Sequence, residues 1–144
     1  ACDWLHTGTT APPGLGWFIA ASFFNGAALE IGRKIRGPDG EEEGVRTYSR
    51  LWGRRTATLA WLGTLTLTAG CAIQAADRVD FLRPAAGTLT ILLFAALALA
   101  RAFLAHPTNP NSRRLDHFSG LWTISLYLLL GIVPLALKKL GAVP

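Results

Sequence analysis

The sequence predicts an all-α fold, a polytopic transmembrane helical bundle with four spans. Hydrophobic residues make up 51% of the 144 residues and charged residues only 16%, whereas a soluble domain has about 25% charged residues. The charged residues are also bunched, which leaves long stretches without Asp, Glu, Lys or Arg. Each of these stretches is close to the roughly 17 to 25 residues that a membrane-spanning helix requires.

The four predicted spans are separated by two charged segments and one short loop. We place the spans at about 14–31, 56–76, 84–104 and 118–137, with the charged loops at 32–55 and 105–117. The second span alternates Thr and Leu over 64–68, as a strand would. Its run of about twenty uncharged residues outweighs these five, and a helix satisfies its own backbone hydrogen bonds in lipid. Pro134, after Gly131, predicts a kink in the last span. Small residues would let neighbouring helices approach closely, as at Ala95, Ala96, Ala98, Ala100 and Ala102.

Lys and Arg residues are distributed unevenly between the two ends of these spans. Ten of the 14 lie in segments 31–55 and 101–117, and four lie at the opposite end. The positive-inside tendency therefore predicts that loops 32–55 and 105–117 are cytoplasmic and that the C-terminus is external. We expect an integral protein of a bacterial plasma membrane. The same asymmetry accounts for the net charge of +5 without nucleic acid as a partner.

Cysteine and histidine residues are too few and too scattered to form a site. Cys71 lies within an apolar span, where it should behave as a small hydrophobe, and Cys2 is the other cysteine. The histidines show no ligand spacing, and they are His6, His106 and His117. The pattern disfavours both a disulfide framework and a zinc site.

Polar side chains that could bind a ligand or take part in a reaction are concentrated in segment 25–53. Glu30 closes the first apolar span, and Arg33 and Lys34 follow three and four residues later, so all three share one helix face. A carboxylate at membrane depth is a functional candidate. Asn25 is a second polar side chain, more than one turn deeper in the span.

Each of these features also has a purely structural interpretation. The cluster around Glu30 could be an interfacial ion pair whose cations reach the headgroups. Asn25 could form a hydrogen bond between helices, Thr47 could cap a short helix, and the acidic run 41–43 could be merely solvated. The co-occurrence of these groups at one membrane boundary favours the functional interpretation.

Carboxylates and cationic side chains at a membrane boundary are what binding a lipid diphosphate requires. Mg²⁺ is commonly held by one or two carboxylates together with phosphate oxygens, and Arg and Lys neutralise the remaining oxygens. The apolar tail can lie among the spans. Because an allylic diphosphate ionises to a carbocation and pyrophosphate, stabilisation of the leaving group would be the main catalytic contribution.

Segment 25–53 resembles the second aspartate-rich region of the UbiA-type intramembrane prenyltransferases. The likeness lies in the acidic and basic helix end, the charged loop, and the ending from Gly44 to Gly53, with its Gly-x-x-Thr and Leu-x-Gly. The four spans look like the last four of that family's nine. The resemblance implies a transferase that moves a polyprenyl group from its diphosphate to an aromatic or other lipophilic acceptor, using Mg²⁺.

By position, the resemblance implies roles for particular residues. Glu30 and Asp39 would be catalytic. Arg33 and Lys34 would contact the diphosphate, and Asn25 would line the substrate cavity. The metal ligands would be Glu30, Asp39, Glu41 and Glu42.

The sequence departs from the family pattern at two points. The second motif of the family is Asp-x-x-x-Asp, whereas the fourth residue after Glu30 is Lys34. The first motif, Asn-Asp-x-x-Asp-x-x-x-Asp, does not occur in these residues. The sequence begins at Ala1 and contains no methionine, so we expect that motif in a missing N-terminal half and expect this fragment alone to be inactive.

Two rival classes of membrane protein share part of this pattern. The CDP-alcohol phosphotransferases also hold metals with clustered aspartates, but here Asp39 and Gly40 are followed by three glutamates and Gly44, which does not match their motif. A non-catalytic or divergent membrane protein, such as a transporter or structural subunit, accounts for the spans and the sidedness. It leaves the dense ionic segment without a purpose.

Overall fold

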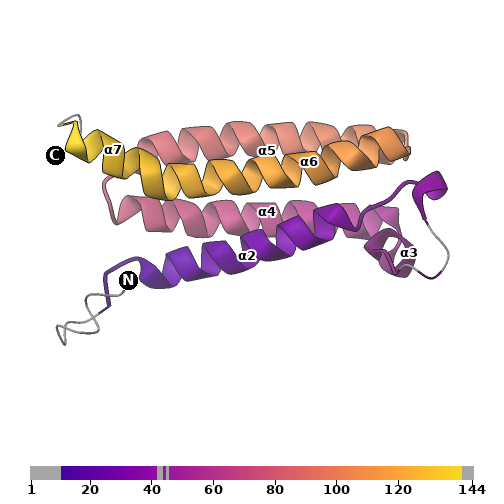
Figure 1. Ribbon diagram of the computed structural model, residues 1–144, viewed down its shortest axis with the longest axis horizontal. Helices are drawn as coiled ribbons and strands as arrows, with labels where there is room; N and C mark the ends of the chain where they lie inside the picture. The colour runs from indigo at the N-terminus through magenta and orange to yellow at the C-terminus, as the bar shows by residue number, and fades with distance from the viewer. Residues whose placement is uncertain (1–10, 42–43, 45, 141–144) are drawn as a thin grey trace.

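The protein is built from four long helices and several short helical segments (Figure 1). The computed structural model describes residues 11–41, 44 and 46–140, and those residues contain no strand. The helices are α2 (Leu15–Arg33), η1 (Pro38–Gly40), α3 (Tyr48–Trp52), α4 (Arg54–Asp77), α5 (Leu82–Ala105), α6 (Asn109–Tyr127), the π-helical turn η2 (Leu128–Ile132) and α7 (Val133–Lys139).

The four long helices run alternately in opposite directions and pack as one antiparallel bundle. Helix α2 packs along α4, α4 packs along α5, and α6 closes the bundle against both α5 and α2. The connection from α2 to α4 and the connection from α5 to α6 therefore lie at the same end, opposite α7 (Figure 1). We call this end, formed by residues 34–41, 44, 46–53 and 106–117, the charged end.

Four helices are long and apolar enough to cross a membrane, as the sequence predicts. The outer surface of the bundle is apolar as well, with Phe23, Ile91 and Phe94 each about 70% exposed. Exposed apolar side chains of this kind are unfavourable in water and suit contact with lipid. An integral membrane protein follows from these helices.

Small side chains occupy the contacts between helices. Ala21 and Ala28 of α2 and Ala57 of α4 are essentially inaccessible to solvent. Of the alanines singled out in the third span, Ala96 and Ala100 are buried, one turn apart on α5, whereas Ala98 is exposed. The buried ones let the helix backbones approach closely, which supplies packing energy where lipid supplies no hydrophobic drive.

The threonines of α4 explain why an alternating sequence forms a helix here. The hydroxyl of Thr58 donates to the carbonyl of Arg54 at 2.8 Å, and the hydroxyl of Thr68 donates to the carbonyl of Thr64 at 2.8 Å. These hydroxyls form hydrogen bonds within their own helix, so burying them in an apolar medium leaves no polar group unpaired. The helical prediction for 56–76 is confirmed.

Helices α2, α4 and α6 come into close contact at Gly32. The indole N–H of Trp61 donates to the hydroxyl of Ser119 at 2.9 Å, and that hydroxyl donates to the carbonyl of Leu115 at 2.8 Å. A Cβ atom at Gly32 would overlap Ser119 Oγ and would stand 2.9 Å from Trp61 Nε1. Glycine is therefore required at this position for the buried hydrogen bond to form beside it.

The expected loop 105–117 is largely wrong, because α6 begins at Asn109 rather than near residue 118. Thr108 has the extended backbone of a helix N-cap, with φ −103° and ψ 160°, and Pro110 follows within the first turn. Proline is favoured there because its missing N–H would have no partner in any case. The polar residues 109–117 are therefore helical.

The irregularity predicted at Pro134 takes the form of a π-helical turn. Residues Leu128–Ile132 form the wider turn immediately before Val133 and Pro134. Proline lacks an N–H and its ring meets the carbonyl four residues earlier. That carbonyl belongs to Leu130, which lies inside the π-helical turn. The wider turn therefore makes room for the ring of Pro134.

Replacing Gly32 by alanine tests the close crossing of the three helices. We expect Gly32→Ala to lower the free energy of unfolding by about 1 to 3 kcal/mol, because the new methyl group forces Ser119 and Trp61 apart. The measurement is unfolding of the purified protein in detergent. Gly63→Ala is the matched control, since a Cβ there meets no atom within 4 Å, and it should not destabilise the bundle. Equal stability of the two variants would contradict the proposed packing.

Candidate functional site

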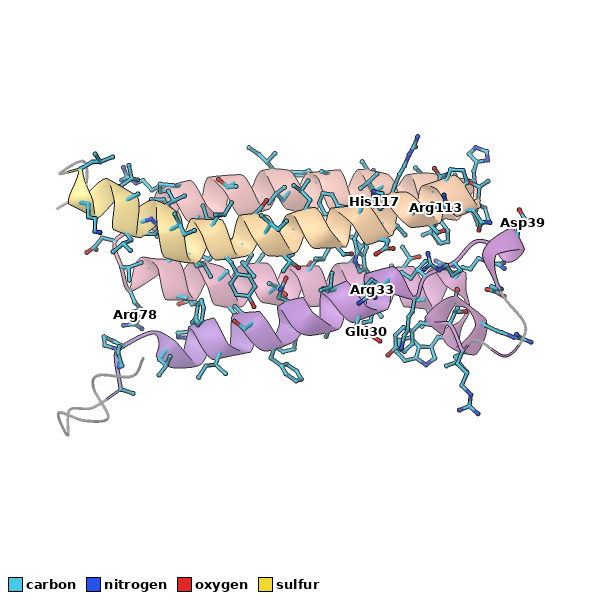
Figure 2. The ribbon with its side chains drawn as sticks, in the orientation of Figure 1. Glu30, Arg33, Asp39, Arg78, Arg113 and His117 are labelled. Atoms are coloured by element: carbon cyan, nitrogen blue, oxygen red, sulfur yellow. The ribbon has the colours of Figure 1, made fainter. Side chains whose placement is uncertain are left out.

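The end of α2 carries an ion pair on the outer face of the bundle. Lys34 Nζ lies 2.6 Å from Glu30 Oε1, and both side chains are about half exposed. Figure 2 shows Glu30 on the side of α2 that faces away from α6. Lys34 Nζ also lies 5.7 Å from the centre of the Tyr48 ring. The hydrogen bond to the Glu30 carboxylate raises the pKa of Lys34 above its ordinary value, and the negative charge of that carboxylate adds to the effect.

Helix α3 packs back against the C-terminal end of α2 through backbone hydrogen bonds. The backbone N–H of Tyr48 donates to the carbonyl of Lys34 at 3.1 Å, and the backbone N–H of Arg36 donates to the hydroxyl of Ser49 at 3.0 Å. Thr47 Oγ1 accepts a hydrogen bond from the backbone N–H of Arg50 at 3.3 Å, which caps α3. The structural interpretation of Thr47 is confirmed.

The segment 37–40 is seated on the first turn of α6. A Cβ atom at Gly37 would lie 2.8 Å from the carbonyl carbon of Thr108 and 2.9 Å from the backbone nitrogen of Asn109. A Cβ atom at Gly40 would overlap the Asn109 side chain. Gly37 therefore allows a backbone contact that a larger residue would push apart, and Gly40 leaves room for the Asn109 side chain.

A polar cavity of about 550 Å³ lies between this segment and the first turns of α6. Two arginines, two aspartates and four other residues line it: Arg36, Asp39, Gly40, Asn109, Ser112, Arg113, Asp116 and His117. Figure 2 shows Asp39 at the tip of the charged end and Arg113 on the α6 segment that approaches it. We call this space the charged cavity.

The polar groups of the charged cavity are not fully engaged with one another. Within the described ranges, no ion pair joins Arg36 or Arg113 to a carboxylate. Asn109 Oδ1 is buried and has no hydrogen-bond partner among the same residues. The cavity therefore presents both cationic and anionic groups that can bind a ligand.

The structure divides the predicted site residues between two places. Asp39 lines the charged cavity, whereas Glu30, Arg33 and Lys34 do not, and all three are exposed on α2. Glu41 Oε1 lies 3.6 Å from Arg54 Nη2. Glu42 lies outside the described residues. In the part of the chain that the structure describes, no three His, Cys, Asp or Glu side chains come together as a metal-binding group.

Asn25 has the interhelical role that its depth in α2 allows. It is 2% exposed, and its Oδ1 accepts a hydrogen bond from the hydroxyl of Thr123 at 3.2 Å. This bond joins α2 to α6 in the middle of the bundle. It satisfies a polar side chain that would otherwise be unpaired in an apolar environment.

The residues that α6 brings to the charged cavity are absent from the sequence-based candidates. Asn109, Ser112, Arg113, Asp116 and His117 are spaced three and four residues apart, which places them on one helix face. That spacing carries meaning only for a helix, and segment 105–117 was expected as a loop. The signal that could have found them is the helix start at Thr108, with proline two residues later.

Replacing Gly37 by alanine tests the contact that forms the charged cavity. The backbone of Gly37, with φ −72°, suits alanine, so the added methyl group acts only by pushing Thr108 and Asn109 away. We expect amide hydrogen exchange in peptides covering 36–41 to become about tenfold faster, from a local cost of about 1 to 3 kcal/mol. Gly120→Ala on α6, where a Cβ meets open space, is the control. Unchanged exchange in Gly37→Ala would show that the segment is not seated as described.

Relatives provide no further constraint on the site. Comparisons with protein-family models, curated proteins and solved structures find no match for this chain. Its chemistry is therefore argued from the side chains that the fold brings together.

Proposed function

We propose that the chain is the C-terminal part of a membrane-embedded prenyltransferase that moves a polyprenyl group from its diphosphate to an aromatic or other lipophilic acceptor. The supporting observation is the charged cavity, where guanidinium groups and carboxylates meet at one end of four apolar helices. A prenyl diphosphate needs a charged site and an apolar site next to each other. Its headgroup needs cationic partners, and its tail needs an apolar environment beside them.

The cavity residues suit both the leaving diphosphate and the Mg²⁺ ion that would accompany it. Arg36 and Arg113 would bind the diphosphate oxygens, because a guanidinium group can donate two parallel hydrogen bonds to a phosphate. Asp39 and Asp116 line the same cavity and would supply oxygen ligands to Mg²⁺, for which two carboxylates with phosphate oxygens are a common set. Mg²⁺ held there would neutralise negative charge on the diphosphate.

The reaction in this proposal is a substitution at the allylic carbon. The bond between that carbon and the diphosphate oxygen breaks, a new bond to the acceptor forms, and the acceptor releases a proton. The contribution of the chain is to stabilise the leaving diphosphate with Arg36 and Arg113. The apolar helix faces would take the tail away from water.

Glu30, Arg33 and Lys34 keep a role in the proposal as a second charged surface. They are exposed on α2 near the charged end. We propose that they face a missing N-terminal half of a longer protein, which would carry the first aspartate-rich motif. The diphosphate would then be held between that half and the residues of this chain.

One observation favours a second candidate, a non-catalytic or divergent membrane protein such as a transporter or structural subunit. The carboxylate of Glu30 is engaged by Lys34 at 2.6 Å. A carboxylate neutralised by a neighbouring cation is a weaker ligand for a metal ion. The second candidate keeps the helical bundle and gives the ionic residues a structural purpose only.

Substitution of the two proposed catalytic acids in the complete protein distinguishes these candidates. We expect Asp39→Asn and Glu30→Gln each to lower Mg²⁺-dependent transfer of a labelled prenyl group by roughly two to three orders of magnitude, because each removes a carboxylate proposed to hold the Mg²⁺ that neutralises the leaving diphosphate. Asp77→Asn, at the opposite end of α4, is the control and should be fully active. Membrane insertion, checked by protease protection, should be unchanged in all three.

The pattern of losses is informative. Loss with Asp39→Asn alone would place the chemistry in the charged cavity, and loss with Glu30→Gln alone would place it on the outer face of α2. Full activity in both variants would remove the proposed roles of these residues.

A further inference from the structure

Helix α3 exposes apolar and cationic side chains side by side. Leu51 is 58% exposed and Trp52 is 47% exposed. Arg46 and Arg50 are also exposed, and they line a cavity of about 320 Å³ together with Gly44 and Leu51. None of these residues lines the charged cavity. The α3 surface is therefore a second feature of the charged end, with its own chemistry.

The fold holds α3 at the level where a membrane span begins. Only Gly53 separates α3 from α4, one of the helices suited to cross a membrane. The backbone of Gly53 is in the left-handed region, with φ 79°, which favours glycine and turns the chain between the two helices. Figure 1 shows α3 beside the ends of α2 and α4.

The aromatic side chains of α3 suit an interface between water and lipid. The rings of Tyr48 and Trp52 lie 4.4 Å apart. Tyrosine and tryptophan are enriched at the headgroup level of membranes, where an apolar ring and a polar edge are both satisfied. Leu51, next to Trp52, adds apolar surface that is unfavourable in water at this position.

The two arginines provide the complementary charge. Among the described residues, no carboxylate lies within 4.0 Å of the guanidinium group of Arg46 or Arg50. A guanidinium group binds phosphate through paired hydrogen bonds, and two of them beside an apolar side chain match a phosphate that carries acyl chains. A lipid with net negative charge is favoured over a zwitterionic one, whose positively charged ammonium group the arginines repel.

We propose that Arg46, Arg50, Leu51 and Trp52 form a binding site for an anionic phospholipid of the surrounding bilayer. The headgroup phosphate binds Arg46 and Arg50, and the start of the acyl chains lies against Leu51 and Trp52. The site is separate from the charged cavity and does not depend on the proposed transferase activity.

Retention of lipid by the intact chain tests this site. The protein is reconstituted with equal amounts of phosphatidylglycerol and phosphatidylcholine, extracted in mild detergent, and examined by native mass spectrometry. We expect bound phosphatidylglycerol to exceed phosphatidylcholine. The double variant Arg46→Gln, Arg50→Gln should reduce this ratio about fivefold for each arginine removed, the contribution expected for one cation near an anionic surface.

A control of equal charge change separates the site from the general positive charge of the protein. Arg83→Gln with Lys139→Gln removes two exposed cations at the opposite end of the bundle and should leave the ratio unchanged. An equal loss in both double variants, or no loss in either, would overturn the proposal.

A second measurement needs no change at the arginines. Tryptophan fluorescence is recorded in bilayers that contain lipids brominated near the headgroup, for the original protein and for Trp52→Phe. We expect Trp52 to account for a large part of the quenching by these lipids and to be poorly quenched by aqueous iodide. Strong iodide quenching of Trp52 with no quenching by brominated lipid would place α3 in water and overturn the proposal.

Discussion

The bundle depends on the close approach of α2, α4 and α6, and on the absence of water around them. In an apolar medium each polar group must find its partner inside the protein. The buried bond from Trp61 to Ser119 meets that requirement beside Gly32, the residue that leaves room for it. The bond between Thr123 and Asn25 repeats the arrangement deeper in the bundle. The small residues that let the helices approach closely therefore also allow the buried hydrogen bonds between them to form.

This packing decides what the charged end can do. Because neighbouring helices are antiparallel, the connection from α2 to α4 and the connection from α5 to α6 lie at the same end, and the segment 37–40 meets the first turn of α6. Residues far apart in the sequence, such as Asp39 and Asp116, therefore line one cavity. The same end also carries α3, whose Arg50 and Leu51 line a separate cavity. Two kinds of binding surface can thus share one end of the protein without sharing residues.

The sequence was sufficient for features that rest on composition over many residues. Uncharged runs predicted four helices suited to span a membrane, and the spacing of Glu30 and Lys34 predicted their contact. Features that rest on tertiary contact were not accessible in this way. The part played by α6 in the charged cavity is not predicted, because the polar composition of residues 109–117 favours a loop, for which helical spacing carries no meaning. No sequence pattern placed Asp39 apart from Glu30, because that separation depends on how segment 37–40 packs on α6.

The π-helical turn at Leu128–Ile132 changes the phase of everything that follows it. One extra residue in a helix advances the later side chains by about 100° around the axis, since an α-helix has 3.6 residues per turn. The buried stripe of α6, which includes Leu115, Trp122 and Leu126, accordingly ends at Leu129. Val133 and Leu135 point outward instead. The π-helical turn thus rotates the side chains of α7 relative to those of α6, so that one continuous helix turns a different face towards the bundle after Leu129.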